Sequence, residues 1–169
     1  MRILFAHRHV ARCLKEFSVA HKRIAQSISI IQCKAVIFME VKVRHIDQVK
    51  FSIQARSHTV ICDQPTDNGG ADAGMTPPEL LLASLGSCAA FYAVQYLKTR
   101  KLAESGVEVT VTAGKLMQPA RLGNFHILVV CPVPLTEEHT LGLLRSVHHC
   151  LIHNTLLSPP EIKIELVAE

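Results

Sequence analysis

The feature that most constrains this chain is a helix-length segment that is apolar on every face. Between Leu80 and Val94 the only polar side chains are Ser84, Ser87 and Tyr92. A surface helix carries a single apolar stripe, so a segment without a polar face must be covered all round, by protein or by lipid. The chain has 169 residues, which is enough for one domain with a buried core.

The boundaries of this helix are marked in the sequence. A turn-rich loop, QPTDNGGADAGMTPP at 64–78, precedes it. Thr76 can serve as N-cap, with Pro77 at the first helical position and Glu79 completing a capping-box pattern. We expect the helix to run to about Lys101 and to end before Gly106.

Lipid is a poor candidate for what covers the helix. The run 80–97 approaches the length that spans a bilayer. It contains Gly86 and Gln95, however, begins at a capped loop, and stands alone in a chain of amphipathic strands. We therefore expect no membrane association.

Alternating apolar and polar residues predict antiparallel strands with one face exposed to water. A second helix is predicted at 135–150 (LTEEHTLGLLRSVHHC), with Thr136 as its cap and Cys150 at its end. Strands and helices are segregated along the chain, so the fold class is α+β. The expected strands lie at 41–47, 50–57, 58–63, 106–114, 124–133 and 161–169, and the loop before the fifth holds Pro119 and Gly123.

The number of elements limits how the central helix can be covered. One sheet can cover one side of it, and the other side then requires a second copy of the same chain. We expect an obligate two-fold homodimer.

Charge divides the chain at about residue 38. The whole chain carries 18 basic residues (Lys and Arg) and 14 acidic residues (Asp and Glu). Residues 1–38 contain seven of the basic residues and one acidic residue, so residues 39–169 contain 11 basic and 13 acidic residues. The body is therefore mildly acidic and unsuited to bind nucleic acid. We expect a basic extension at 1–38, either a targeting peptide or an upstream extension, and one domain at 39–169.

The six cysteines show no C-x-x-C spacing, and the sequence has no secretory signal pattern. We expect a cytoplasmic protein whose cysteines are thiols unless chemistry uses them. Cys62 and Cys131 lie in predicted strands and are interpreted as packing residues. Cys13 and Cys33 lie in the extension and receive no role.

Two motifs together resemble those of a known family. PPELLLASLGSCAA at 77–90, followed 62 residues after its Cys88 by CLIHNTLL at 150–157, resembles the OsmC/Ohr family of osmotically inducible and organic hydroperoxide resistance proteins. The likeness covers roughly residues 40–168 in element order and spacing, and is nearer to the generic branch than to the dedicated peroxidases. It implies an OsmC-like intertwined homodimer with antiparallel sheets around long central helices and active sites at the subunit interface.

The resemblance also implies a chemistry. Cys88 would attack an organic hydroperoxide and become a sulfenic acid, Cys150 would condense with it to a disulfide, and an external dithiol would reduce the pair. No cofactor and no metal is implied. An apolar interface suits a hydrophobic hydroperoxide.

The thiolate of such a cysteine needs a nearby cation or hydrogen bonds. Strong peroxidases of the family orient an arginine with a glutamate ten residues before the first cysteine, where this chain has Pro78. Glu79 follows one residue later, about 100° round the helix, and is a candidate as orienting residue or as helix cap. Arg56 and Arg44 are the candidate arginines.

Two alternatives remain open. A non-catalytic dimeric binding protein would hold a hydrophobic small molecule at the dimer interface, with the cysteines incidental. A zinc site would use His149, Cys150 and His153 with Cys88 as fourth ligand.

Overall fold

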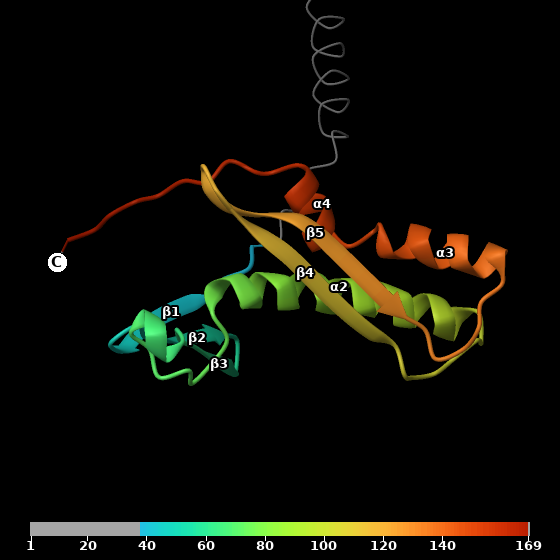
Figure 1. The fold of residues 1–169 in the computed structure, drawn as a ribbon, viewed down its shortest axis with the longest axis horizontal. Helices are drawn as coiled ribbons and strands as arrows, with labels where there is room; N and C mark the ends of the chain where they lie inside the picture. The colour runs from blue at the N-terminus through green and yellow to red at the C-terminus, as the bar shows by residue number, and fades with distance from the viewer. Residues whose placement is uncertain (1–37, 169) are drawn as a thin grey trace, which may run out of the picture. The chain divides into compact units, whose positions relative to one another are not determined.

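The computed structural model describes residues 38–168 of the chain. The chain divides into two units, Met1–Glu40 and Val41–Glu169, and all the described elements belong to the second. The expected basic extension at 1–38, with Cys13 and Cys33, lies outside the described residues except for Phe38. The elements are β1 (Lys42–Asp47), β2 (Lys50–Ala55), β3 (His58–Cys62), the 3-10 helix η1 (Thr66–Asn68), α2 (Pro77–Thr99), β4 (Glu108–Met117), β5 (Ala120–Val130), α3 (Glu137–Val147) and α4 (Leu151–Leu157) (Figure 1).

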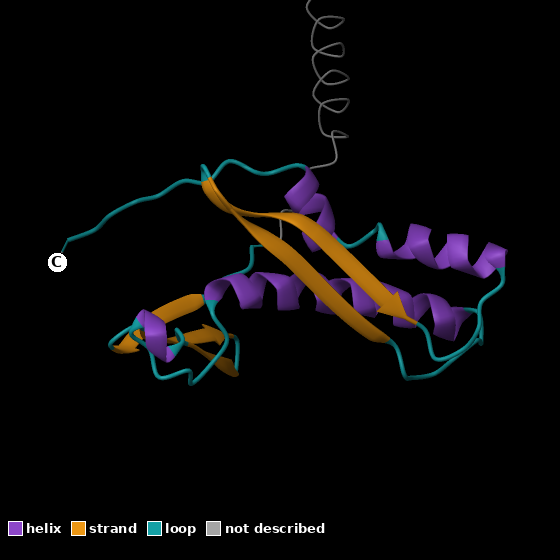
Figure 2. Cartoon of the chain, viewed as in Figure 1, coloured by secondary structure: helices purple, strands orange, loops and turns teal. Residues whose placement is uncertain are grey.

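The strands form two separate antiparallel sheets, as Figure 2 shows, which confirms the α+β class. The first has the order β1-β2-β3. Its register places Val43 opposite Ile53 and Ile53 opposite Val60, so these side chains share one face. Val43 is 59% exposed and Val60 43% exposed. One apolar face of this sheet is therefore only partly covered.

The central helix α2 begins as the sequence predicts. The Thr76 hydroxyl oxygen accepts the backbone N–H of Glu79, and the Glu79 carboxylate accepts the backbone N–H of Thr76 at 2.7 Å, so the capping box is complete. Among residues 38–168, α2 is the one helix that is long enough and apolar enough to cross a membrane. This test uses length and composition alone, and the core helices of soluble proteins pass it too.

Two elements cover α2 along one side. The β4–β5 hairpin crosses it, and α3 lies alongside its C-terminal half (Figure 1). The Ser146 hydroxyl donates to the Tyr92 carbonyl oxygen at 3.1 Å, and the Tyr96 hydroxyl bonds Nδ1 of His139 at 3.2 Å. The fully buried row on α2, with at most 1% exposure, consists of Leu85, Ala89, Ala93 and Leu97.

The opposite side of α2 is not covered within this unit. Phe91 is 57% exposed and Leu81 36% exposed. The sequence requires a helix apolar on every face to be covered all round, and one chain covers only part of it.

The prediction of a sixth strand at 161–169 is wrong for residues 161–168, which are the part of this segment that the structure describes. Residues 158–168 contain no strand, and Ile162 and Ile164 are more than three-quarters exposed (Figure 2). The period-2 pattern is present, but a strand exists only when a neighbouring strand pairs with it, and this unit supplies none to the segment. Gly123, expected in a loop, lies inside β5, which begins directly after the Pro119 turn.

The loop after β3 is organised by one buried carboxylate, Asp63. It accepts the backbone N–H groups of Gln64 at 2.9 Å and of Ala71 and Ala73 at 3.1 Å each. Burial acts to raise the pKa of this carboxyl, but the three hydrogen bonds and nearby Lys50 more than offset it and hold the pKa below its usual value.

Asp63→Asn should therefore destabilise the protein in a pH-dependent manner. A carboxyl whose folded-state pKa is lowered stabilises the fold above its unfolded pKa of about 3.9, and this stabilisation is lost as pH falls through the folded value. We expect the variant to melt roughly 5 °C or more below the wild type at neutral pH, with the gap narrowing in acid. Thermal unfolding followed by circular dichroism across pH measures this. Asp67→Asn, in exposed η1, is the matched control, and a pH-independent gap for Asp63→Asn would contradict the argument.

Candidate functional site

The structure brings the two predicted cysteines together. Cys88 lies in the middle of α2, and Cys150 lies between α3 and α4. Their thiol groups lie close enough to interact, because the Cys88 thiol helps to raise the pKa of Cys150, and both are free thiols. Two thiols 62 residues apart in the sequence are thus neighbours within one chain.

The two thiols differ in exposure. Cys150 is completely buried, whereas Cys88 is half-buried. Burial raises the pKa of the Cys150 thiol, and its interaction with the neighbouring Cys88 thiol raises it further. The Cys150 thiol is therefore held in its protonated form, and Cys88 is the thiol that a reagent reaches first.

Cys150 does not end the second helix as the sequence predicts. α3 ends at Val147, and Cys150 is instead the N-cap of the separate helix α4, where its sulfur accepts the backbone N–H of His153 at 3.3 Å. The backbone N–H groups of His153 and Ile152 act to lower the pKa of the thiol, against the larger effect of burial. The residues at 150–157 thus place the sulfur against both α2 and the first turn of α4.

Glu79 caps the first turn of α2 in this unit. Its carboxylate accepts both the backbone N–H and the hydroxyl of Thr76, at 2.7 and 2.8 Å, and these bonds lower the pKa of the Glu79 carboxyl. Nine residues separate it from Cys88 along α2. Its contacts are those of the helix cap, the second of the two roles considered for it.

The candidate arginines belong to the first sheet. Arg44 on β1 donates to Oε1 of Gln54 at 3.4 Å. Arg56 lies in the β2–β3 turn with a φ of 55°, and within residues 38–168 its side chain forms no hydrogen bond or ion pair. Neither arginine is joined to Cys88 or Cys150 by a hydrogen bond in the described part of the chain.

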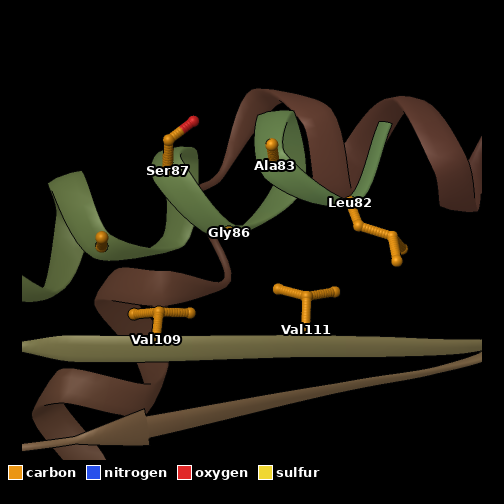
Figure 3. A pocket seen from close by; sticks show the side chains of 7 residues that line it. Leu82, Ala83, Gly86, Ser87, Val109 and Val111 are labelled. Carbon is orange, nitrogen blue, oxygen red and sulfur yellow. The ribbon is translucent and has the colours of Figure 1, made fainter. Parts of the chain in front are cut away.

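The structure contains one cavity against α2 and a second one among β5, α3 and α4. The larger, about 330 Å³, lies between α2 and β4 (Figure 3). Val109 and Val111 point from β4 toward the helix at Gly86, and Leu82 points back toward the strand. This cavity is lined mainly by small and apolar residues: Leu82, Ala83, Gly86, Ser87, Ala90, Val109 and Val111.

The smaller cavity, about 150 Å³, reaches Cys150. Its wall is formed by Ile127, Val129, Leu143, Leu144, Val147, His148, Cys150 and His153. From the sequence, His153 is a candidate only as a ligand in the zinc alternative. No group of three or more His, Cys, Asp or Glu side chains among residues 38–168 is arranged to hold a metal ion, so the described geometry does not support that alternative.

The fold and the paired thiols define an α+β protein with a dithiol centre against its central helix. A family model described as OsmC-like protein matches residues 69–165, which is more than half of the chain. The chain therefore belongs to the OsmC-like family, as its two motifs indicate.

Solved structures share the fold at low sequence identity. A putative osmotic stress induced and detoxification response protein from Psychrobacter arcticus aligns with a TM-score of 0.64 and 20% identity, over 72% of this chain and 90% of that one. The organic hydroperoxide resistance protein OsmC from Legionella pneumophila gives 0.54 and 18%, over 73% and 91%. OhrB, the organic hydroperoxide resistance protein of Bacillus subtilis, gives 0.53 and 17%, over 74% and 94%. No curated protein matches the chain.

Proposed function

We propose that this protein is a thiol peroxidase that reduces organic hydroperoxides to alcohols in defence against oxidative stress. The Cys88 thiolate attacks the outer oxygen of the hydroperoxide; the O–O bond breaks, the alkoxide takes a proton and leaves as an alcohol, and Cys88 becomes a sulfenic acid. The Cys150 thiol then displaces that hydroxyl as water and forms the Cys88–Cys150 disulfide. An external dithiol reduces the disulfide and is itself oxidised.

The closeness of the two thiols, which interact within one chain, is the observation that carries this proposal. A sulfenic acid formed on Cys88 would have the Cys150 thiol beside it, which is the condition for a recyclable disulfide. The difference in exposure supports the order of the two roles. The half-buried sulfur meets the hydroperoxide, and the buried, protonated sulfur resolves the product.

We propose further that two chains form the working unit. The exposed side of α2, the apolar face of the first sheet and the unpaired segment at 161–168 all leave apolar side chains uncovered in one chain. A second copy related by a two-fold axis would cover them and would shelter the hydrophobic substrate beside Cys88. It would also bring a cation such as Arg56 of the first sheet within reach of a Cys88 thiolate, in the way the family resemblance implies.

Phe91→Glu tests the dimer. A charge on the uncovered side of α2 should disfavour burial of that side, so the variant should sediment as one chain where the wild type sediments as two. Leu141→Glu, on a half-exposed residue of α3, is the matched control. A wild type that sediments as a single chain would contradict the proposal.

The peroxidase itself is tested by thiol counting. One equivalent of cumene hydroperoxide should remove two free thiols per chain, and peptide mapping should recover them joined as Cys88–Cys150. The thiols of Cys62 and Cys131 serve as internal references, since both should stay free. Unchanged thiols, or a disulfide between other cysteines, would count against the proposal.

The 330 Å³ apolar cavity favours a second candidate, a dimeric binding protein for a hydrophobic small molecule. Neither reactive cysteine lines that cavity, so in this case the thiols would be incidental. The same experiment separates the two, because a binder would leave the thiol count unchanged while an apolar fluorescent ligand would still bind.

A further inference from the structure

His153 carries a buried ring nitrogen that the reaction above does not use. Its Nδ1 atom is enclosed, and no donor or acceptor among residues 38–168 pairs with it. Buried polar atoms are usually paired, and an orphan calls for an explanation. His153 is one of the residues that line the 150 Å³ cavity, and Cys150 is another.

The position of His153 relative to the resolving sulfur is fixed by the backbone. Cys150 is the N-cap of α4, and the backbone N–H of His153 donates to its sulfur at 3.3 Å. The imidazole is thus carried by a residue whose backbone already contacts Sγ, and both residues line one small cavity.

Disulfide closure requires a proton to move in that space. Cys150 is completely buried and its pKa is raised, so its thiol must lose a proton where water is largely excluded. Five of the eight wall residues are aliphatic, and the other titratable side chains of the wall are His148 and His153. His148 lies on the exposed side at the end of α3, with its ring centroid 5.2 Å from that of His153.

We propose that Nδ1 of His153 accepts the Cys150 proton during disulfide closure. As the Cys150 sulfur attacks the sulfenic sulfur of Cys88, the S–H proton passes to Nδ1 and the S–S bond forms while the S–O bond breaks. The hydroxide that leaves takes the proton and departs as water, so His153 ends as it began. The N–H groups of His153 and Ile152 stabilise the charge that develops on the Cys150 sulfur. This step rests on the proposed peroxidase function and assigns a role within it.

The test separates the two chemical steps in a single turnover of the full-length protein. Sulfenic acid on Cys88 is trapped with dimedone after one equivalent of cumene hydroperoxide, and closure is followed by loss of the second free thiol. Proton transfer by a placed side chain typically contributes about 10²–10⁴-fold. His153→Asn should therefore form the sulfenic acid at the wild-type rate and close to the disulfide about 100-fold more slowly. His149→Asn, on the neighbouring exposed histidine outside the cavity, should leave both rates unchanged.

Chemical rescue distinguishes proton transfer from packing. His153→Ala enlarges the cavity, and added imidazole should restore much of the closure rate, whereas pyrazole, which has the same shape and is a much weaker base, should not. Closure of His153→Asn at the wild-type rate, or equal rescue by imidazole and pyrazole, would overturn the inference while leaving the peroxidase intact. Absence of both the sulfenic acid and the Cys88–Cys150 disulfide in the wild-type protein would overturn the peroxidase proposal itself, at the first step.

Discussion

Replacing Cys88 with serine is expected to lower hydroperoxide turnover by about 10³-fold or more, the scale on which loss of a covalent nucleophile acts. The serine hydroxyl has nearly the size of the thiol but does not ionise near neutral pH, and it cannot pass through a sulfenic acid. The assay is consumption of cumene hydroperoxide in the presence of a small dithiol.

Cys131→Ser is the matched control for this experiment. Cys131 is a free, partly buried thiol that packs against the cluster around Leu97, and burial raises its pKa, as burial does for Cys150. Its replacement should leave turnover unchanged. Thermal unfolding of both variants checks that the fold survives. Turnover by Cys88→Ser within a few-fold of wild type would show that Cys88 is not the nucleophile.

The start of α2 was predictable because its signals are local. Thr76, Pro77 and Glu79 lie within one turn of each other, and a capping box requires only those neighbours. The strands β1 to β5 were predictable for the same reason, and along β4 the alternation of apolar and polar residues matches the alternation of covered and exposed side chains.

The position of Cys150 was not predictable from local signals. The sequence from Thr136 to Cys150 contains no proline, and its one glycine, Gly142, lies in mid-helix against the Tyr96 ring rather than at the break after Val147. Cysteine is also not among the preferred N-cap residues, so the sequence has no local signal that a new helix begins at Cys150. The placement of His153 depends on that break, which is why its relation to the Cys150 sulfur emerges only from the structure.

The contact between Cys88 and Cys150 could be expected from the family resemblance but not from the residues themselves. Their spacing along the chain says nothing of their distance in space, and the expectation that they meet came from the family resemblance alone. The structure supplies the missing reason: α3 packs along α2 through Tyr92 and Tyr96, and the turn after α3 then returns the chain to the middle of α2. The segment at 161–168 is the opposite case. Its alternating pattern of apolar and polar residues is clear, but none of the described strands pairs with it.

Cys150→Ser is expected to stop the cycle after its first half. The variant should form the Cys88 sulfenic acid at a rate within about twofold of wild type, because Cys150 is buried and does not meet the hydroperoxide. It should then lose one thiol per hydroperoxide instead of two, and dithiol-dependent turnover should fall by about 100-fold. Dimedone labelling and thiol titration measure the two parts separately.

The same variant also tests whether the interaction between the two thiols matters before oxidation. A serine hydroxyl at position 150 keeps a donor toward Cys88, so the first step should be preserved, whereas Cys150→Ala removes the donor and should slow it. With the Cys150 thiol removed, excess hydroperoxide should drive the Cys88 sulfenic acid of either variant on to sulfinic acid, a mass increase of two oxygen atoms on the Cys88 peptide. Normal cycling of Cys150→Ser with the dithiol would mean that the reductant attacks the sulfenic acid directly, and Cys150 would then have no part in turnover.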